Sequence, residues 1–104
     1  MSVYIVTRHA GAIRWLQSSG ITGEIISQWT DERTNQLVPG DLVVGVLPLP
    51  VIADVIRTGA RFGLLNLPAI AFSQRGQELS PEEMEHAGAN VTEIVSVRMG
   101  SRLV

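Results

Sequence analysis

The segment from Leu42 to Leu47 most constrains the fold of this 104-residue chain, because six consecutive residues carry no polar side chain. Asp41 precedes the segment, and Pro48 and Pro50 end it. A strand that is apolar on both faces is typical of a parallel sheet covered by helices on both sides. The segment therefore predicts a β-strand inside an α/β domain built in layers.

The other predicted elements alternate around this strand. Strands are predicted at Val3–Thr7, Glu24–Trp29, Arg61–Leu67 and Asn90–Val97, and helices at about 11–20, 50–59 and 80–88. The residues Ser80, Pro81 and Glu83 form a capping-box pattern, which marks the start of the last helix. Residues 30–40 and 68–77 are predicted loops, the first of them an irregular connection between two strands. The order β-α-β-β-α-β-α-β predicts one three-layer α/β domain over residues 1–104, with a mainly parallel sheet.

Composition excludes several classes of function. The absence of cysteine excludes disulfide scaffolds, thiolate metal sites and cysteine nucleophiles. All eight basic residues are arginine, and ten acidic residues give a net charge of −2, so the basic excess typical of a duplex-binding protein is absent. The longest apolar stretch, 42–53, is broken by glycine and proline and is too short to span a bilayer. We therefore expect a soluble, cytoplasmic protein that binds neither duplex nucleic acid nor membrane.

Three segments that follow predicted strands carry the candidate site, because open α/β sheets bind ligands beyond the carboxyl ends of their strands. They are 7–11, 45–48 and 66–68. Within the second and third segments, the candidate ligand-binding residues are Gly45, Leu47, Pro48 and Asn66.

The segment from Thr7 to Gly11 is the most informative. Arg8 is a permanent cation with a planar fork of donors, and His9 can exchange a proton near neutral pH. Thr7 adds a hydroxyl, and Gly11 lets backbone amides approach an anion at the start of a helix. These groups together could bind a phosphodiester and stabilise charge that develops on it. The alternative is that Arg8 pairs with a nearby carboxylate and His9 only caps the turn.

The remaining candidates have two interpretations each. Gly45 leaves room either for a ligand or for a neighbouring backbone. Arg75, in the predicted 68–77 loop, either closes over an anion or is solvated. Arg57 and Arg61 lie at the far end of the second helix and are predicted to pair on the surface.

The acidic group Glu82, Glu83, Glu85 and His86 has the residue types of a metal site. Acidic residues are also expected in the first turn of a helix, and no second cluster matches them, so we predict no metal there. Trp15 and Trp29 are predicted to anchor the core or an interface.

The residues from Tyr4 to His9, with Gly11, Ala12 and Trp15, resemble the opening of the small CRISPR-associated Csx-sixteen proteins of type III systems. The similarity covers about Val3–Val97. It continues through Pro39-Gly40-Asp41, Gly45, Leu47-Pro48, Gly59-Ala60, Leu65, Arg75-Gly76, Glu78-Leu79-Ser80, Glu82-Glu83 and Gly88-Ala89. The chain departs from the family pattern at Ala10, where proline is common, and near Pro50, where a polar residue is common.

The resemblance implies a Rossmann-like (CARF-like) ring nuclease that binds cyclic tetra-adenylate and cleaves it without metal or cofactor, through the ribose 2′-hydroxyl. It implies that Arg8 and His9 are catalytic, with His9 as general acid or base. The implied ligand-binding residues are Thr7, Gly11, Gly45, Leu47, Pro48, Asn66 and Arg75. Because the ring has twofold symmetry and the chain is small, we expect a homodimer. The alternatives are a sponge that binds the cyclic oligonucleotide without cutting it, and a structural subunit without nucleotide affinity.

Overall fold

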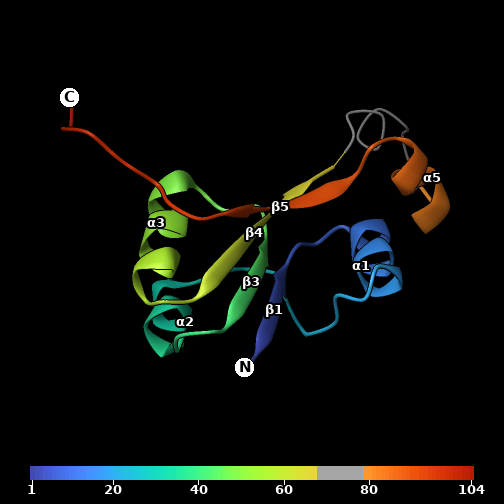
Figure 1. Ribbon diagram of the computed structural model, residues 1–104, viewed down its shortest axis with the longest axis horizontal. Coiled ribbons are helices and arrows are strands. Elements are labelled where there is room, and N and C mark those ends of the chain that lie inside the picture. Colours follow the sequence, from blue (N-terminus) through green and yellow to red (C-terminus); the bar gives the residue numbers. More distant parts are fainter. Residues whose placement is uncertain (68–78) are drawn as a thin grey trace.

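A five-stranded mixed sheet forms the centre of the computed structural model, which describes residues 1–67 and 79–104 (Figure 1). Its strands are β1 (Val3–Val6), β2 (Glu24–Ile26), β3 (Leu42–Gly45), β4 (Arg61–Asn66) and β5 (Asn90–Ile94), in the order β2-β1-β3-β4-β5. The first four strands are parallel, and β5 is antiparallel to β4. The described helices are α1 (Ala10–Ser18), α2 (Asp31–Gln36), α3 (Leu49–Arg57) and α5 (Pro81–His86). The prediction of an α/β domain with a mainly parallel sheet is confirmed.

Helices cover both faces of the sheet, with α1 and α5 on one side and α2 and α3 on the other (Figure 1). Two separate clusters of buried side chains fill the spaces between the layers. The first consists of Ile5, Ala12, Trp15, Leu16, Val44, Leu65, Leu79, Met84 and Ala89. The second consists of Val6, Leu37, Val43, Ile52, Val55, Ala60 and Phe62. The three-layer arrangement expected from the order of elements is therefore present.

The apolar run in β3 is explained by its place in the middle of the sheet. Val44 belongs to the first cluster and Val43 to the second, and neither side chain has any exposed surface. The same alternation holds in β1, where Ile5 faces the first cluster and Val6 the second. Successive residues of a strand point to opposite faces, so a strand covered on both faces must be apolar at every position.

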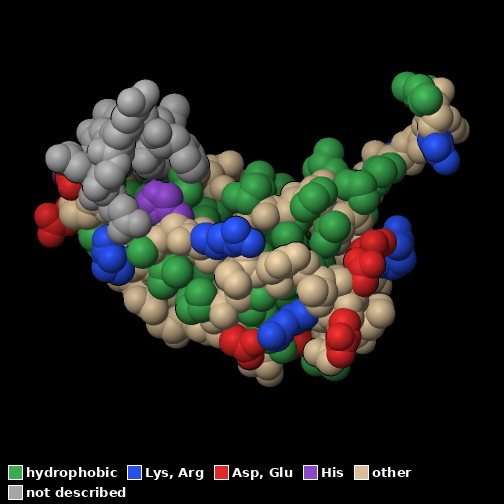
Figure 2. Space-filling model, turned by 180° about the vertical axis from the view of Figure 1, so that it is seen from behind, with side chains coloured by type: hydrophobic (Ala, Val, Ile, Leu, Met, Phe, Trp, Pro, Cys, Tyr) green, Lys and Arg blue, Asp and Glu red, His purple; other side chains and the backbone are tan. Residues whose placement is uncertain are grey.

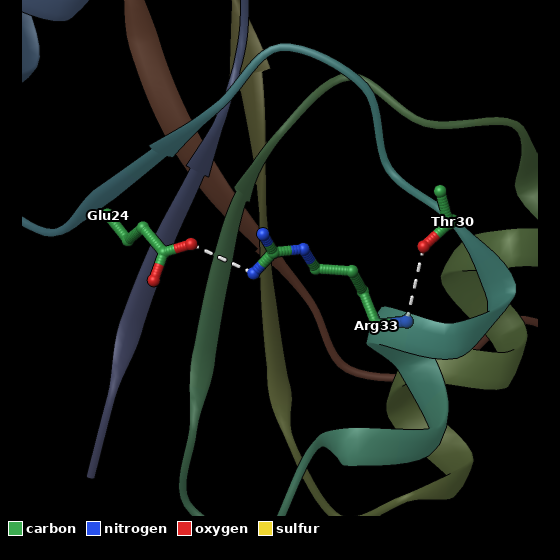
Figure 3. A network of polar contacts seen from close by, with 3 residues as sticks. All are labelled: Glu24, Thr30 and Arg33. Atoms are coloured by element: carbon green, nitrogen blue, oxygen red, sulfur yellow. Dashed lines mark hydrogen bonds and ion pairs between the residues drawn. The ribbon is translucent and has the colours of Figure 1, made fainter.

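The prediction that residues 30–40 form an irregular loop is wrong, because Asp31–Gln36 is the helix α2. Thr30 caps it by accepting a hydrogen bond from the Arg33 N–H at 3.4 Å, and two acidic residues occupy its first turn. The Arg33 guanidinium also pairs with Glu24 of β2 at 2.8 Å (Figure 3). The apolar periodicity that predicts helices is missing here, since Thr34 is the only buried residue of α2.

Several strands are shorter than predicted, and most of the shortening is at the carboxyl edge. β3 was expected to reach Leu47 but ends at Gly45, where its register partner Val6 is also the last residue of β1. Beyond Val6 the chain turns, because the His9 N–H donates to the Thr7 hydroxyl at 3.1 Å. β2 ends at Ile26 rather than Trp29, and β5 ends at Ile94 rather than Val97. The predicted loop 68–77 lies outside the described residues.

The strand order reverses at β1. The chain passes from β1 to β2 on one side and then returns to β3 on the other side of β1. Loops that leave β1 and β3 therefore diverge and open a crevice at the carboxyl edge, where doubly wound sheets bind ligands.

Candidate functional site

A cavity of about 440 Å³ lies at this reversal point. Its lining includes the residue that follows each of the four parallel strands, namely Thr7, Ser27, Val46 and Leu67. The other lining residues are Val6, Arg8, His9 and Leu65. The volume lies in the range of small-molecule sites.

The polar side of the cavity comes from the turn between β1 and α1. Arg8 is exposed, and its Nε donates to the backbone carbonyl of Ser27 at 3.2 Å, so the side chain reaches from the end of β1 to the end of β2. None of the ion pairs between described residues includes Arg8. The alternative prediction was that Arg8 pairs with a nearby carboxylate, and no such pair is present among the described residues.

His9 is the N-cap of α1. Its Nδ1 accepts a hydrogen bond from the Ala12 N–H at 3.0 Å, and the ring is half-buried. The capping role that the sequence offered as an alternative for His9 is thus confirmed. It does not conflict with a ligand-binding role, because the same ring also lines the cavity.

Gly11 is buried in the first turn of α1, and the space beside its Cα is occupied. A Cβ on this residue would lie 3.1 Å from Cε1 and 3.3 Å from Nδ1 of His9, and 3.2 Å from the Leu79 carbonyl oxygen. The glycine therefore makes room for the His9 ring. The predicted role of its amide toward an anion stays a prediction.

The segment from Gly45 to Pro48 approaches the cavity mainly through Val46. Gly45 is buried, and a Cβ there would lie 2.3 Å from the Val6 carbonyl oxygen, so its small size serves the close approach of two strands. Leu47 packs against the second cluster. Pro48 precedes α3, and its carbonyl accepts from the N–H groups that open this helix. The predicted ligand contacts of Gly45, Leu47 and Pro48 are not among the lining residues of the cavity.

Asn66 also lies beside the cavity rather than in its lining. Its amide donates to the Asn90 side-chain oxygen at 2.9 Å, which joins the ends of β4 and β5. Leu65 and Leu67, on either side of it, face the cavity. Arg75, the remaining predicted ligand contact, lies outside the described residues.

Reasoning from the sequence missed Ser27 and the apolar lining. Ser27 follows β2 directly, but the predicted strand ran on to Trp29 and hid this position. Val46 was hidden in the same way inside the predicted strand of Leu42–Leu47. Both positions could have been found by ending all the parallel strands at one level. The last residue of the four-residue β1 pairs with the last residue of β2 and with the last residue of β3.

The acidic residues of α5 have structural roles. Ser80 and Glu83 form the predicted capping box, and Glu85 accepts a 2.8 Å hydrogen bond from the Trp15 indole. Bonds from Ser80 hold the pKa of Glu83 below its usual value. Within residues 1–67 and 79–104, no group of three or more His, Cys, Asp or Glu side chains could hold a metal ion.

Further predictions about surface and buried side chains are confirmed. Arg57 pairs with Asp54 at 2.7 Å, and Arg61 pairs with Glu93 at 2.9 Å. Trp15 is a core residue that is 5 % exposed, and Trp29 packs edge-on against Tyr4 with ring centroids 6.0 Å apart. Two other cavities, of about 500 and 610 Å³, lie between α2 and α3 and beside α1 and α5, away from the carboxyl edge.

The fold defines a class of small α/β protein with a cavity at the reversal point of its sheet. The described lining of this cavity combines Arg8 and the helix-capping His9 with apolar side chains, so the cavity suits a ligand that carries both an anionic group and a flat ring.

Residues 4–97 match the family model described as "Putative CRISPR-associated protein (Cas_VVA1548)", and the chain belongs to this family. No curated protein and no solved structure matches the chain significantly. In the part of the chain that the structure describes, no helix is long and apolar enough to cross a membrane.

Proposed function

We propose that this protein is a ring nuclease of the Csx-sixteen type that binds and cleaves cyclic tetra-adenylate. The carrying observation is the cavity at the carboxyl edge, where Arg8 and His9 face the same space as Val46, Leu65 and Leu67. An adenylate unit has a phosphodiester that suits the basic side and a base whose flat aromatic faces suit the apolar lining. Membership in a CRISPR-associated family makes the second messenger of type III systems the natural candidate ligand.

The proposed reaction needs little from the protein, because the substrate carries its own nucleophile. The ribose 2′-oxygen loses its proton and attacks the adjacent phosphorus, and the bond from phosphorus to the 5′-oxygen breaks. The 5′-oxygen takes up a proton, so the proton count balances and a 2′,3′-cyclic phosphate remains. Two such cuts on opposite sides of the ring give two linear di-adenylates. The protein must align these groups and stabilise the added negative charge, for which Arg8 is placed.

The size of the cavity supports a site shared by two copies of the chain. A volume of about 440 Å³ can hold part of a four-nucleotide ring but not the whole. A twofold dimer would offer two identical cavities to the two equivalent halves of the ring.

The direct test incubates the protein with cyclic tetra-adenylate and separates the products by chromatography. Removing one group that stabilises the transition state typically costs about 10²–10³ in rate, so we expect losses of that order for Arg8→Ala and His9→Ala. The matched controls are Arg57→Ala and His86→Ala, which remove exposed side chains away from the cavity and should cleave like wild type. Wild-type protein that leaves the ring intact, or full activity in Arg8→Ala, contradicts the proposal.

The second candidate is a sponge that binds the ring without cutting it. The observation in its favour is that no carboxylate is among the described residues that line the cavity, while Nδ1 of His9 is already engaged by the Ala12 N–H. A sponge would give tight binding in calorimetry and an unchanged ring in chromatography. A chain with neither binding heat nor thermal shift would instead be a structural subunit.

A further inference from the structure

The C-terminal tail (residues 98–104) leaves the body of the molecule on the side of α2 and α3. Val97, directly before it, still packs against the second cluster of buried side chains. Figure 1 shows the tail running outward past α3 and away from α2. Every residue of the tail is exposed, and the large apolar side chains of Met99, Leu103 and Val104 are 56 %, 95 % and fully exposed. These apolar groups therefore remain unburied in the single chain.

The tail also differs in charge from the rest of the chain. It contains two arginines, Arg98 and Arg102, and no acidic residue, whereas residues 1–97 have six arginines against ten acidic residues. The tail thus carries a charge of +2 and the rest of the chain a charge of −4. Neither tail arginine forms an ion pair with a described residue. The hydrogen bond that Arg102 donates to the Val104 carbonyl lies within the tail itself. A second copy of the chain therefore offers a body of complementary charge.

A cavity of about 500 Å³ between α2 and α3 lies on the side from which the tail departs. Its lining consists of polar and charged residues, namely Asp31, Thr34, Asn35, Asp54, Arg57 and Thr58. Arg57 pairs with Asp54 at 2.7 Å, whereas Asp31 forms no ion pair with a described residue. Asp31 thus gives the cavity a carboxylate that can accept from a guanidinium group.

We propose that the C-terminal tail of one copy docks into the cavity between α2 and α3 of a second copy, with a tail arginine on Asp31, so that the two chains exchange tails. Seven extended residues reach about 23 Å, which is enough to cross from one chain to the next. Val38, after α2, and Leu49, at the start of α3, are 56 % and 63 % exposed and would be covered by Met99 and Leu103 of the partner.

This arrangement is an isologous dimer, in which each chain gives one tail and receives one. A twofold axis along the strands brings the α2 and α3 sides of two copies together and leaves both carboxyl edges at the same end of the dimer. The inference does not depend on the proposed function, because it concerns an interface and needs no nucleotide. The tail also lies outside residues 4–97, which match the family model.

The test mixes two variants with opposite changes. Arg98→Glu/Arg102→Glu makes the tail acidic and Asp31→Arg makes the cavity basic, so each variant alone is repelled at both contacts of the dimer. In an equimolar mixture the acidic tail meets the basic cavity, and the unchanged tail meets the unchanged cavity. We expect each variant alone to have a dimer dissociation constant at least about tenfold above that of wild type, and the mixture to regain the dimer.

Light scattering over a range of protein concentrations measures these states against the 11.3 kDa of one chain. The matched control is Glu32→Arg, which makes the same change in the first turn of α2 at a residue that does not line the cavity. It should dimerise like wild type. If the two variants are monomeric and their mixture stays monomeric, the tail does not dock on a second copy and the inference is overturned.

A shortened variant that ends at Val97 removes all contacts of the tail at once. We expect it to be folded, by circular dichroism, and monomeric at concentrations where wild type is a dimer. Dimerisation as tight as that of wild type would overturn the inference. A monomeric wild type whose tail binds single-stranded RNA in fluorescence anisotropy would also overturn it, because the basic tail would then have a different partner.

Discussion

At the scale of single residues, the turn from Thr7 to Gly11 shows what sequence can and cannot predict. Arg8 and His9 were identified because they follow a strand and precede a helix, which is a local property. Their partners, the Ser27 carbonyl and the Ala12 N–H, depend on how β2 and α1 fold around them. The role of Gly11 was assigned to its amide, whereas the structure shows its missing side chain making room for His9.

Replacing Gly11 by alanine tests this packing. Alanine favours a helix by about 0.5–1 kcal/mol over glycine, but its Cβ presses on the His9 ring and the Leu79 carbonyl. We therefore expect a melting temperature near that of wild type together with a rate of ring cleavage lower by roughly tenfold to a hundredfold, because His9 is displaced. Circular dichroism and the chromatographic assay measure the two effects. Gly100→Ala, where a Cβ meets nothing within 4 Å, is the control and should change neither.

The hydrogen bonds of Asp41 predict that the folded protein loses free energy of unfolding in acid. Its buried carboxylate accepts from the Val38 N–H at 3.0 Å and from the Ser2 N–H at 2.9 Å, and these bonds hold its pKa below the usual 3.8. The folded state therefore binds this proton more weakly than the unfolded state. The stabilisation is complete above pH 3.8 and is lost as the pH falls through the lowered value.

The measurement is urea unfolding of wild type and Asp41→Asn at pH 7 and at pH 2–3. We expect Asp41→Asn to be the less stable protein at pH 7 and the difference to shrink in acid. Asp54→Asn, which changes an exposed aspartate paired with Arg57, should differ little from wild type at either pH. A difference for Asp41→Asn that is the same at both pH values would show that the carboxylate charge is not responsible.

At the scale of elements, the helices and strands with an apolar pattern or a capping box were predicted, and α2, which has neither, was not. Val43 and Val44 alternate between two buried clusters, so the place of β3 in a covered sheet could be predicted from its residues. α2 has a polar sequence and is held by the Thr30 cap and the Arg33–Glu24 pair, which periodicity does not detect. The antiparallel direction of β5 was also beyond prediction, because a strand has the same pattern in either direction.

The contact between β4 and β5 gives a prediction for a pair of residues. Gly63 of β4 is buried, and a Cβ there would lie 2.7 Å from Cγ1 of Val91 in β5. Overpacking of this kind typically costs about 1–3 kcal/mol, so Gly63→Ala should lower the free energy of unfolding by that amount.

The double variant Gly63→Ala/Val91→Ala supplies the control, because it removes the methyl group that the new Cβ meets. We expect it to be more stable than the sum of the two single changes predicts, by denaturant unfolding. Strict additivity would mean that Gly63 is required for another reason.

At the scale of the whole molecule, the face seen in Figure 2 has basic side chains that are dispersed rather than gathered. On the face in Figure 2, Arg side chains are separated by other residues, and some lie beside acidic ones. This fits the net charge of −2 and the proposal of a site that uses one or two cations. Hydrophobic side chains gather on the same face toward the base of the C-terminal tail (Figure 2). Composition does not predict whether a second copy of the chain or a ligand contacts this surface, because it does not say where on the molecule the side chains lie.

The expected homodimer is a prediction at this scale. Val46 and Leu49, near the carboxyl edge, are 62 % and 63 % exposed, which is high for large apolar side chains. Light scattering should give twice the 11.3 kDa of one chain, and the dimer should persist when cyclic tetra-adenylate is bound. A monomer that binds the ring tightly would contradict the shared site.

The position of β1 between β2 and β3 has a consequence for how the chain folds. β1 pairs with β2 on one edge and with β3 on the other. In the β1–β3 pairing, Val3 lies opposite Leu42. β1 is therefore completed on both edges only when residues about forty positions further along the chain pair with it, and closing that loop costs chain entropy before any contact repays it. Until β3 arrives, Ile5 and Val6 face water on an open strand edge. The pairing of β1 with β3, which also brings the two sides of the cavity together, therefore closes the longest loop among the strand pairs of the sheet.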